Sequence, residues 1–253
     1  MLEAEIRKRK ESRDILLMTH LVLGYPSFDV CRRVVEQMVL SGVDLMELQI
    51  PFSEPIADGP VILHANQKAL AAGSTVEKCL ELTAKLTKEF PIPFLFMTYY
   101  NIAFVRGVAR FAKEMREAGV KGAIIPDLPF EEGEALLSAM ATEKLEPVYL
   151  FAPSSPEARM KSIAERASGF VYCVARKGVT GTQTDFASLD AYLARARRAT
   201  KLPLALGFGV QNRADVTAIT GKVEIAVVGS ESLRILDKDG VDGIKPFITS
   251  LRP

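Results

Sequence analysis

Short apolar runs alternate with longer amphipathic stretches along the whole chain. The runs have the length of strands and are mostly apolar on both faces, which is typical of buried parallel strands. In the stretches between them apolar residues recur at helical spacing. We predict strands at 15–23, 43–50, 94–100, 122–126, 147–152, 170–175, 202–208 and 225–229. We predict helices at 2–13, 27–41, 64–72, 74–89, 103–118, 131–144, 155–167, 185–200 and 212–220, and two short helices after the last strand.

This alternation predicts a (β/α)₈ TIM barrel formed by one α/β domain over 1–253, with a short extra helix at the N-terminus. Eight strand–helix units in a chain of 253 residues are typical of that fold. The alternative is an open doubly wound sheet, which would place a glycine-rich turn after the first strand. The residues there are Gly-Tyr-Pro-Ser, at 24–27, which is a different pattern.

Charge and composition exclude several classes of partner. The formal net charge is +1, which argues against a nucleic-acid or membrane-surface partner. The N-terminal segment is charged and lacks the apolar core of a signal peptide, and no apolar run approaches the ~20 residues that span a bilayer. Three cysteines without metal-binding spacing are expected to be buried, reduced thiols in a cytoplasmic protein. Because the chain has only two histidines, we expect no His-rich metal site, although carboxylates alone could hold magnesium weakly, and we predict no metal ligands.

The segment 43–60 contains the strongest candidate for chemistry. Its strand alternates so that Glu47 and Gln49 share one face, while the other face is apolar apart from Asp44. A proline-rich loop follows and carries Asp58. Burial without a partner favours the protonated form of a carboxyl group, which suits a general acid or base at Glu47. The alternative is a glutamate that lines the barrel and is satisfied by a hydrogen bond.

Glycine-rich loops follow the last three predicted strands, at 177–181, 207–209 and 229–230. Glycine lets backbone N–H groups approach a phosphate closely, and the N-terminus of a following helix adds a favourable dipole. One such loop would be ordinary turn chemistry, but three at adjacent strand ends predict a phosphate site. The chain has no Walker lysine pattern, so we expect the phosphate of a small substrate rather than of ATP.

Two aromatic residues lie beside these loops. Tyr172 alternates with Val174 on the sixth predicted strand and can face the interior, and Phe208 lies between the glycines of the seventh loop. Each alone is equally consistent with a core side chain. With the carboxylates and the anion site, they suit a planar, partly apolar phosphate ester that undergoes proton transfer.

Six stretches resemble the alpha subunit of tryptophan synthase, over essentially the whole length. They are MELQIPFSEPIADGP (46–60), TYYN (98–101), IIPDLPFEE (124–132), VYCVARKGVTG (171–181), LGFGV (206–210) and VVGSESL (227–233). The resemblance implies a carbon–carbon lyase of tryptophan biosynthesis. Its reaction is the retro-aldol cleavage of indole-3-glycerol phosphate to indole and glyceraldehyde 3-phosphate.

The resemblance also implies roles for individual residues. Glu47 corresponds to the family's strand glutamate, which protonates indole C3, and Asp58 to the loop aspartate, which accepts the indole N–H. Tyr172 matches a tyrosine that lines the pocket and assists Glu47. Thr180 matches the threonine that bonds the loop aspartate on closure. The remaining implied substrate- and phosphate-binding residues are Tyr99, Gly181, Phe208, Gly209, Gly229 and Ser230.

The family's quaternary organisation is part of the same expectation. This subunit needs no cofactor, and its partner is a pyridoxal-phosphate beta subunit that receives indole through a tunnel in an α2β2 complex. The loops 52–60 and 126–133 are expected to face that partner.

Three positions depart from the family pattern. Gln49 replaces a usual glycine, and we expect it either to narrow the pocket or to hold Glu47 by a hydrogen bond. Glu54 replaces a usual aspartate near the partner. His20 replaces a usual phenylalanine, and we interpret it as an altered pocket lining rather than a new catalytic group.

Two other functions compete with the lyase. A metal-dependent epimerase or a ketose isomerase would also bind phosphate, but His20 and His64 cannot supply an epimerase's ligands. A subunit that only regulates its partner is the other alternative, and the presence of Glu47 and Asp58 argues against it.

Overall fold

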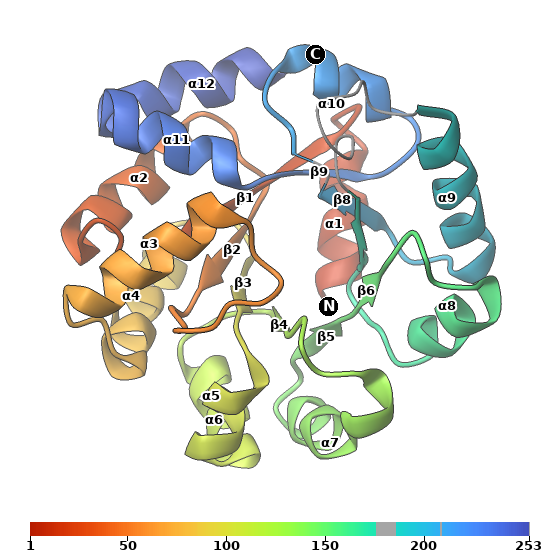
Figure 1. The fold of residues 1–253 in the computed structure, drawn as a ribbon, viewed down its shortest axis with the longest axis horizontal. Coiled ribbons are helices and arrows are strands. Elements are labelled where there is room, and N and C mark those ends of the chain that lie inside the picture. Colours follow the sequence, from red (N-terminus) through yellow and green to blue (C-terminus); the bar gives the residue numbers. More distant parts are fainter. Residues whose placement is uncertain (176–185, 208, 253) are drawn as a thin grey trace.

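The computed structural model describes residues 1–175, 186–207 and 209–252 (Figure 1). Its strands are β1 Leu16–Val22, β2 Leu45–Gln49, β3 Phe94–Met97, β4 Gly122–Ile124, β5 Glu146–Val148, β6 Leu150–Phe151, β7 Val171–Val174, β8 Leu204–Gly207 and β9 Ile225–Val228. Its helices are α1 Leu2–Lys10, α2 Phe28–Leu40, α3 Pro60–Ala71, α4 Val76–Glu89, α5 Tyr100–Arg106, α6 Val108–Glu117, α7 Glu134–Thr142, α8 Glu157–Ala164, α9 Phe186–Ala199, α10 Arg213–Ile219, α11 Ser230–Asp239 and α12 Ile244–Leu251. Two short 3₁₀ helices, η1 Phe130–Glu132 and η2 Val241–Gly243, complete the described elements.

The strands form one parallel sheet in the order β5-β4-β3-β2-β1-β9-β8-β7-β6. Its two end strands, β5 and β6, are separated in the chain by Tyr149 alone, whose carbonyl accepts a hydrogen bond from the backbone N–H of Tyr172 (3.0 Å). They are the two halves of the single strand predicted at 147–152, so the sheet closes through its own backbone. The predicted barrel is therefore confirmed, and the open doubly wound sheet is excluded.

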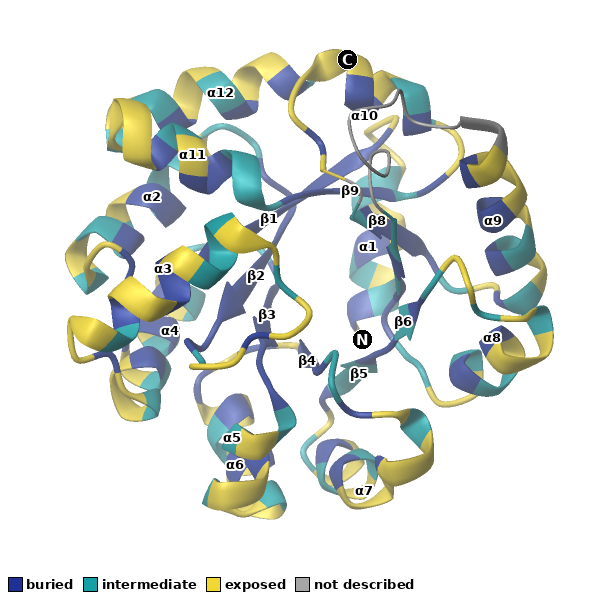
Figure 2. Cartoon of the chain, viewed as in Figure 1, coloured by how far each residue is buried: buried dark blue, intermediate teal, exposed yellow. Residues whose placement is uncertain are grey.

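The buried apolar residues form two separate layers. The inner layer fills the barrel, as expected when alternate residues of every strand point inward. Its strand members include Leu16, Met18, Leu45, Leu95, Met97, Ile124, Val148, Ala205, Ile225 and Val227. Leu2 and Ile6 of α1 belong to this layer, so α1 covers one end of the barrel, as Figure 1 shows at the centre of the ring. The outer layer packs the strands against the surrounding helices, whose exposed faces point outward (Figure 2).

Several helix boundaries differ from the prediction. The predicted helix 103–118 is two helices, because Gly107 takes a φ of +86°, a left-handed conformation that glycine adopts without steric cost. The predicted helix 131–144 is likewise divided into η1 and α7 at Gly133. α3 begins at Pro60 rather than at residue 64, with proline in the first turn, where its missing N–H costs no helical hydrogen bond.

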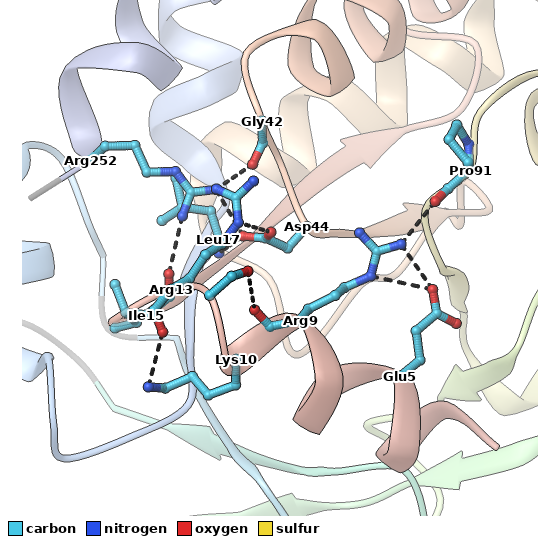
Figure 3. A network of polar contacts seen from close by, with 11 residues as sticks. Glu5, Arg9, Lys10, Arg13, Ile15, Leu17, Gly42, Asp44, Pro91 and Arg252 are labelled. Carbon is cyan, nitrogen blue, oxygen red and sulfur yellow. Dashed lines mark hydrogen bonds and ion pairs between the residues drawn. The ribbon is translucent and has the colours of Figure 1, made fainter.

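An ionic cluster around the buried Asp44 joins residues near the two ends of the chain (Figure 3). The side chain of Asp44 is 2% exposed and accepts hydrogen bonds from the backbone N–H of Leu17 (2.9 Å) and from Arg252 Nη2 (2.8 Å). Arg13 Nε lies 2.9 Å from the other carboxylate oxygen. Arg252 also donates to the carbonyl of Ile15 (3.0 Å). One carboxylate thus fixes the start of β1 and β2 to the C-terminal segment.

We predict that Asp44→Ala lowers the free energy of unfolding by about 3 kcal/mol, because it leaves two guanidinium groups and a buried N–H without their acceptor. Urea denaturation measures the change. Asp242→Ala, at an exposed position of η2, is the control and is expected to change stability by less than about 0.5 kcal/mol. Equal effects of the two substitutions would remove Asp44 from its structural role.

Candidate active site

Glu47 and His20 lie side by side near the carboxyl ends of β2 and β1. The parallel register pairs their Cα positions, so both side chains are on the same face of the sheet. Both residues are buried, with 4% of Glu47 and 2% of His20 exposed. His20 Nδ1 is 2.9 Å from Glu47 Oε1. Glu47 is therefore inside the barrel, as predicted, and His20 contacts it directly.

A chain of hydrogen bonds continues from His20 to Asp58. His20 Nε2 is 3.0 Å from Gln49 Oε1, and Gln49 Nε2 donates to Asp58 Oδ2 at 2.7 Å. The expectation that Gln49 would hold Glu47 directly is thus wrong in detail, because His20 lies between them. The two candidate carboxylates are joined through the two residues that depart from the family pattern. The interpretation of His20 as lining alone missed this polar contact.

The loop after β2 is held in place by Tyr99. Its hydroxyl donates to Asp58 Oδ2 (2.9 Å) and accepts from the backbone N–H of Ala57 (3.1 Å). Its ring stacks on Phe52, with centroids 5.1 Å apart. Burial raises the pKa of the Tyr99 phenol, and the charge of Asp58 raises it further, so the phenol remains a donor. In this structure Tyr99 supports Asp58, and its predicted contact with substrate stays a prediction.

Asn66, on the inward side of α3, is a member of the site that the sequence reasoning missed. Its Oδ1 accepts the backbone N–H of Phe52 (2.9 Å), and its Nδ2 donates to the carbonyl of Ile62 (2.8 Å) and to Gln49 Oε1 (3.3 Å). The only signal in the sequence was a polar residue between Ala65 and Ala69, on the apolar side of a helix.

One oxygen of Glu47 has no protein partner. Oε1 contacts His20, but Oε2 is buried and accepts no hydrogen bond from any described residue. Buried polar atoms are normally satisfied, so an unpaired carboxyl oxygen is a costly feature. Glu47 thus has the hydrogen bond of the alternative interpretation on one oxygen only.

Tyr172 faces the interior from β7, as predicted, and belongs to the margin of the inner apolar layer. Burial raises the pKa of its phenol well above the usual 10, and the negative charges of Glu47 and Asp58 raise it further. The group therefore stays protonated. Gly207 on β8 is needed here, since a Cβ atom at that position would lie 2.7 Å from the Tyr172 hydroxyl.

Part of the predicted phosphate site lies within the described residues. β7, β8 and β9 are neighbours, so the three glycine-rich loops follow adjacent strands. Gly209 takes a φ of +85°. Gly229 is the N-cap residue of α11, and no side chain caps the first N–H groups of this helix, which begins at Ser230. A Cβ at Gly229 would lie 3.9 Å from His20 Cβ, which places this loop beside the acid site. Thr180, Gly181 and Phe208 lie outside the described residues.

Metal binding, thiol chemistry and membrane insertion are three further properties that the described residues bear on. Within 1–175, 186–207 and 209–252, no group of three or more His, Cys, Asp or Glu side chains could hold a metal ion. Cys31, Cys79 and Cys173 are free and buried, as predicted, and burial raises the pKa of each thiol. No helix within the described part of the chain is long and apolar enough to cross a membrane.

The fold and the site together define an α/β-barrel enzyme of acid–base type, with its carboxyl groups at the carboxyl ends of the strands. The family model for the tryptophan synthase alpha chain matches residues 6–247. Tryptophan synthase alpha chains of Syntrophotalea carbinolica and Desulforapulum autotrophicum are 57% and 56% identical to this chain, over 100% and 99% of it and 100% of their own lengths. The solved tryptophan synthase complex of Pyrococcus furiosus has a chain that is 28% identical, with a TM-score of 0.86 over 93% of this chain and 97% of that one. The chain therefore belongs to the tryptophan synthase alpha chain family.

We predict that Tyr99→Phe loosens the loop after β2, because the Ala57 N–H and Asp58 both lose their hydroxyl partner. The expected loss of stability is about 1 kcal/mol, with faster hydrogen exchange in the peptide that contains Ala57. Tyr100→Phe is the matched control at the neighbouring position and should leave that peptide unchanged. Unaltered exchange in Tyr99→Phe would show that the hydroxyl does not hold the loop.

Proposed function

We propose that Glu47 and Asp58 carry out the retro-aldol cleavage of indole-3-glycerol phosphate to indole and glyceraldehyde 3-phosphate. The chain is a lyase of tryptophan biosynthesis, as a member of its family, and the family needs no cofactor in this subunit. The observation that supports the residue assignment is the buried, unpartnered Oε2 of Glu47, whose other oxygen, Oε1, lies 2.9 Å from His20 Nδ1.

The proposed chemistry balances with these two carboxyl groups alone. Glu47 donates a proton to indole C3, which makes the ring cationic and weakens the bond to the glycerol C3′ carbon. The C3′ hydroxyl then returns a proton to Glu47 as its oxygen becomes an aldehyde, and the electron pair of the broken C–C bond restores the aromatic indole. Asp58 accepts the indole N–H and stabilises the positive charge that develops on the ring. Tyr172, held neutral, assists Glu47.

The phosphate is proposed to bind at the loops after β7, β8 and β9. Gly209, Gly229 and Ser230 are the described candidates, and the start of α11, which has no side-chain cap, supports them. Thr180, Gly181 and Phe208 are also proposed to bind the substrate or its phosphate, and they lie outside the described residues.

We propose a pyridoxal-phosphate beta subunit as partner, in an α2β2 complex of the cytoplasm, with 1–253 as one catalytic domain. The Pyrococcus furiosus structure above is a tryptophan synthase complex, which supports a partner here. Large apolar side chains are exposed in the loop after β2, at Ile56 (80%), and on α5, at Phe104 (66%) and Val105 (75%). Together with the loops 52–60 and 126–133 they offer an apolar docking surface.

Glu47→Gln is expected to abolish indole release, with a loss of at least the ~10²–10⁴-fold typical of a missing general acid. Binding of a glycerol-phosphate ligand should persist, because the amide keeps the shape of the side chain. Indole formation by the purified chain, alone and with a beta subunit, measures the effect. Glu81→Gln, at an exposed position of α4, is the control and should retain full activity. A near-normal rate in Glu47→Gln would disprove the role of Glu47.

Gly229→Asp is expected to weaken the binding of glycerol phosphate about tenfold by charge repulsion, or ~1.4 kcal/mol. Gly229→Ala is the matched control, because a Cβ at this position meets no atom closer than 3.9 Å. It should bind nearly as well as the unmodified chain. Calorimetric titration compares the three proteins, and equal affinities would remove this loop from the phosphate site.

A further inference from the structure

We propose that His20, oriented by Gln49, is a positioning residue that holds one proton jointly with Glu47, so that the proton required by indole C3 is retained at the site. This inference rests on the proposed role of Glu47 and extends it to the two residues that depart from the family pattern. The hydrogen-bonded network has two fixed ends, the carbonyl of Ile62 and the carboxylate of Asp58, and these determine which atoms between them donate.

The first end of the hydrogen-bonded network is a backbone carbonyl. The carbonyl of Ile62 can only accept, so the Asn66 atom 2.8 Å from it must be the amide nitrogen. Asn66 Oδ1 then accepts the backbone N–H of Phe52, which can only donate. The orientation of the Asn66 amide is thus fixed by the backbone on both sides. Its nitrogen presents the remaining hydrogen to Gln49 Oε1, at 3.3 Å.

The second end of the hydrogen-bonded network is the carboxylate of Asp58. The Tyr99 hydroxyl accepts the N–H of Ala57 and so donates its own hydrogen to Asp58 Oδ2. Asp58 is an acceptor toward Gln49 as well, so the Gln49 atom 2.7 Å away is the amide nitrogen. Both ends therefore give the same orientation for Gln49, with its oxygen directed at His20.

This orientation determines where hydrogens lie on the imidazole. Because Gln49 Oε1 is an acceptor, His20 Nε2 must carry a hydrogen to make its 3.0 Å contact. The contact between Nδ1 and Glu47 Oε1 is 2.9 Å and also needs a hydrogen, on one atom or the other. Either an imidazolium faces a carboxylate, or a neutral imidazole accepts from a carboxylic acid. A neutral imidazole beside a carboxylate would leave two acceptors facing each other, so the complete network exists only while the pair holds one proton.

The electrostatic surroundings favour this proton. Burial opposes a charge on His20 and is the largest single effect, but the hydrogen bond to Glu47 and the charges of Glu47 and Asp58 outweigh it. The pKa of His20 is therefore raised above its usual 6.5. Among the described residues on the other sides of His20, β9 is followed by Gly229 and α3 presents Asn66, neither of which titrates.

The raised pKa of His20 affects the pH range in which the pair can donate a proton. Because the pKa of His20 is raised, the pair keeps its proton to a higher pH than a free imidazole, whose pKa is about 6.5, whereas the pKa of a free glutamic acid is only about 4.3. The single proton of the pair can lie on Glu47, from which it passes to indole C3, and the C3′ hydroxyl then returns one proton to the pair. The proton is then replaced without water entering the site.

The first test is nuclear magnetic resonance of the imidazole nitrogens in the whole chain. The chain has only two histidines, His20 and His64. His64 is exposed on α3, so His64→Gln can be made without disturbing the core, and the imidazole signals that remain belong to His20. We expect His20 to titrate above pH 6.5 with Nε2 protonated, and to titrate at a lower pH in Glu47→Gln. Gln49→Met should shift the titration in the same direction by a smaller amount. Titration of His20 below 6.5, or at the same pH in Glu47→Gln, would overturn the proposal.

The second test is the pH profile of indole formation with His20→Gln. This side chain can still donate to Glu47 but cannot carry the proton, so we expect the alkaline limb of kcat/KM to move to lower pH, with a loss of about tenfold at pH 8. A purely structural role would lower the rate equally at all pH values, which would contradict the proposal. The resonance experiment needs no substrate. A coupled His20–Glu47 titration together with an active Glu47→Gln would therefore disprove the function of Glu47 and not the shared proton.

Discussion

The parallel register of β1 against β2 is the constraint on which this site depends. It pairs His20 with Glu47 on the inner face of the barrel. A shift by one residue would turn one of the two side chains into the outer layer, since alternate residues of a strand face opposite sides. The apolar members of the same strands oppose such a shift, because Leu16, Met18 and Leu45 fill the barrel interior. Packing of the apolar core thus determines the geometry of the acid pair.

Two buried carboxyl groups with different surroundings lie at β2, one on each face of the sheet. Asp44 immediately precedes the strand and Glu47 lies at its centre, three positions later, so the two carboxyl groups face opposite sides of the sheet. Asp44 has a full set of partners, namely two guanidinium groups and a backbone N–H, and it joins both ends of the chain. Glu47 has one partnered and one unpartnered oxygen. Asp44 is thus saturated within the protein, whereas Glu47 keeps one oxygen without a partner among the described residues, as its proposed role requires.

Period-two alternation in the sequence was sufficient to place Glu47 inside a barrel, and glycine-rich segments located three adjacent strand ends. The contact between His20 and Glu47 could not be predicted, because the register between two strands depends on the packing of the whole sheet. Asn66 was missed for a related reason, since the prediction began α3 at residue 64 and gave no orientation to its first turns. The division at Gly107 was missed because glycine is also tolerated within helices, and only the backbone reveals its left-handed φ.

A buried polar network of this length is costly unless every member is satisfied. From Ile62 to Asp58 each amide, hydroxyl and imidazole group of this network has a partner of the correct type, whereas Glu47 Oε2 is buried without a partner among the described residues. The network also explains why His20 and Gln49 belong together. A histidine without Gln49 would leave a buried Nε2–H unpaired, and Gln49 without the histidine would keep only the longer, 3.3 Å bond from Asn66 to its oxygen. The two departures from the family pattern are therefore one structural change, and its effect is concentrated on the proton of Glu47.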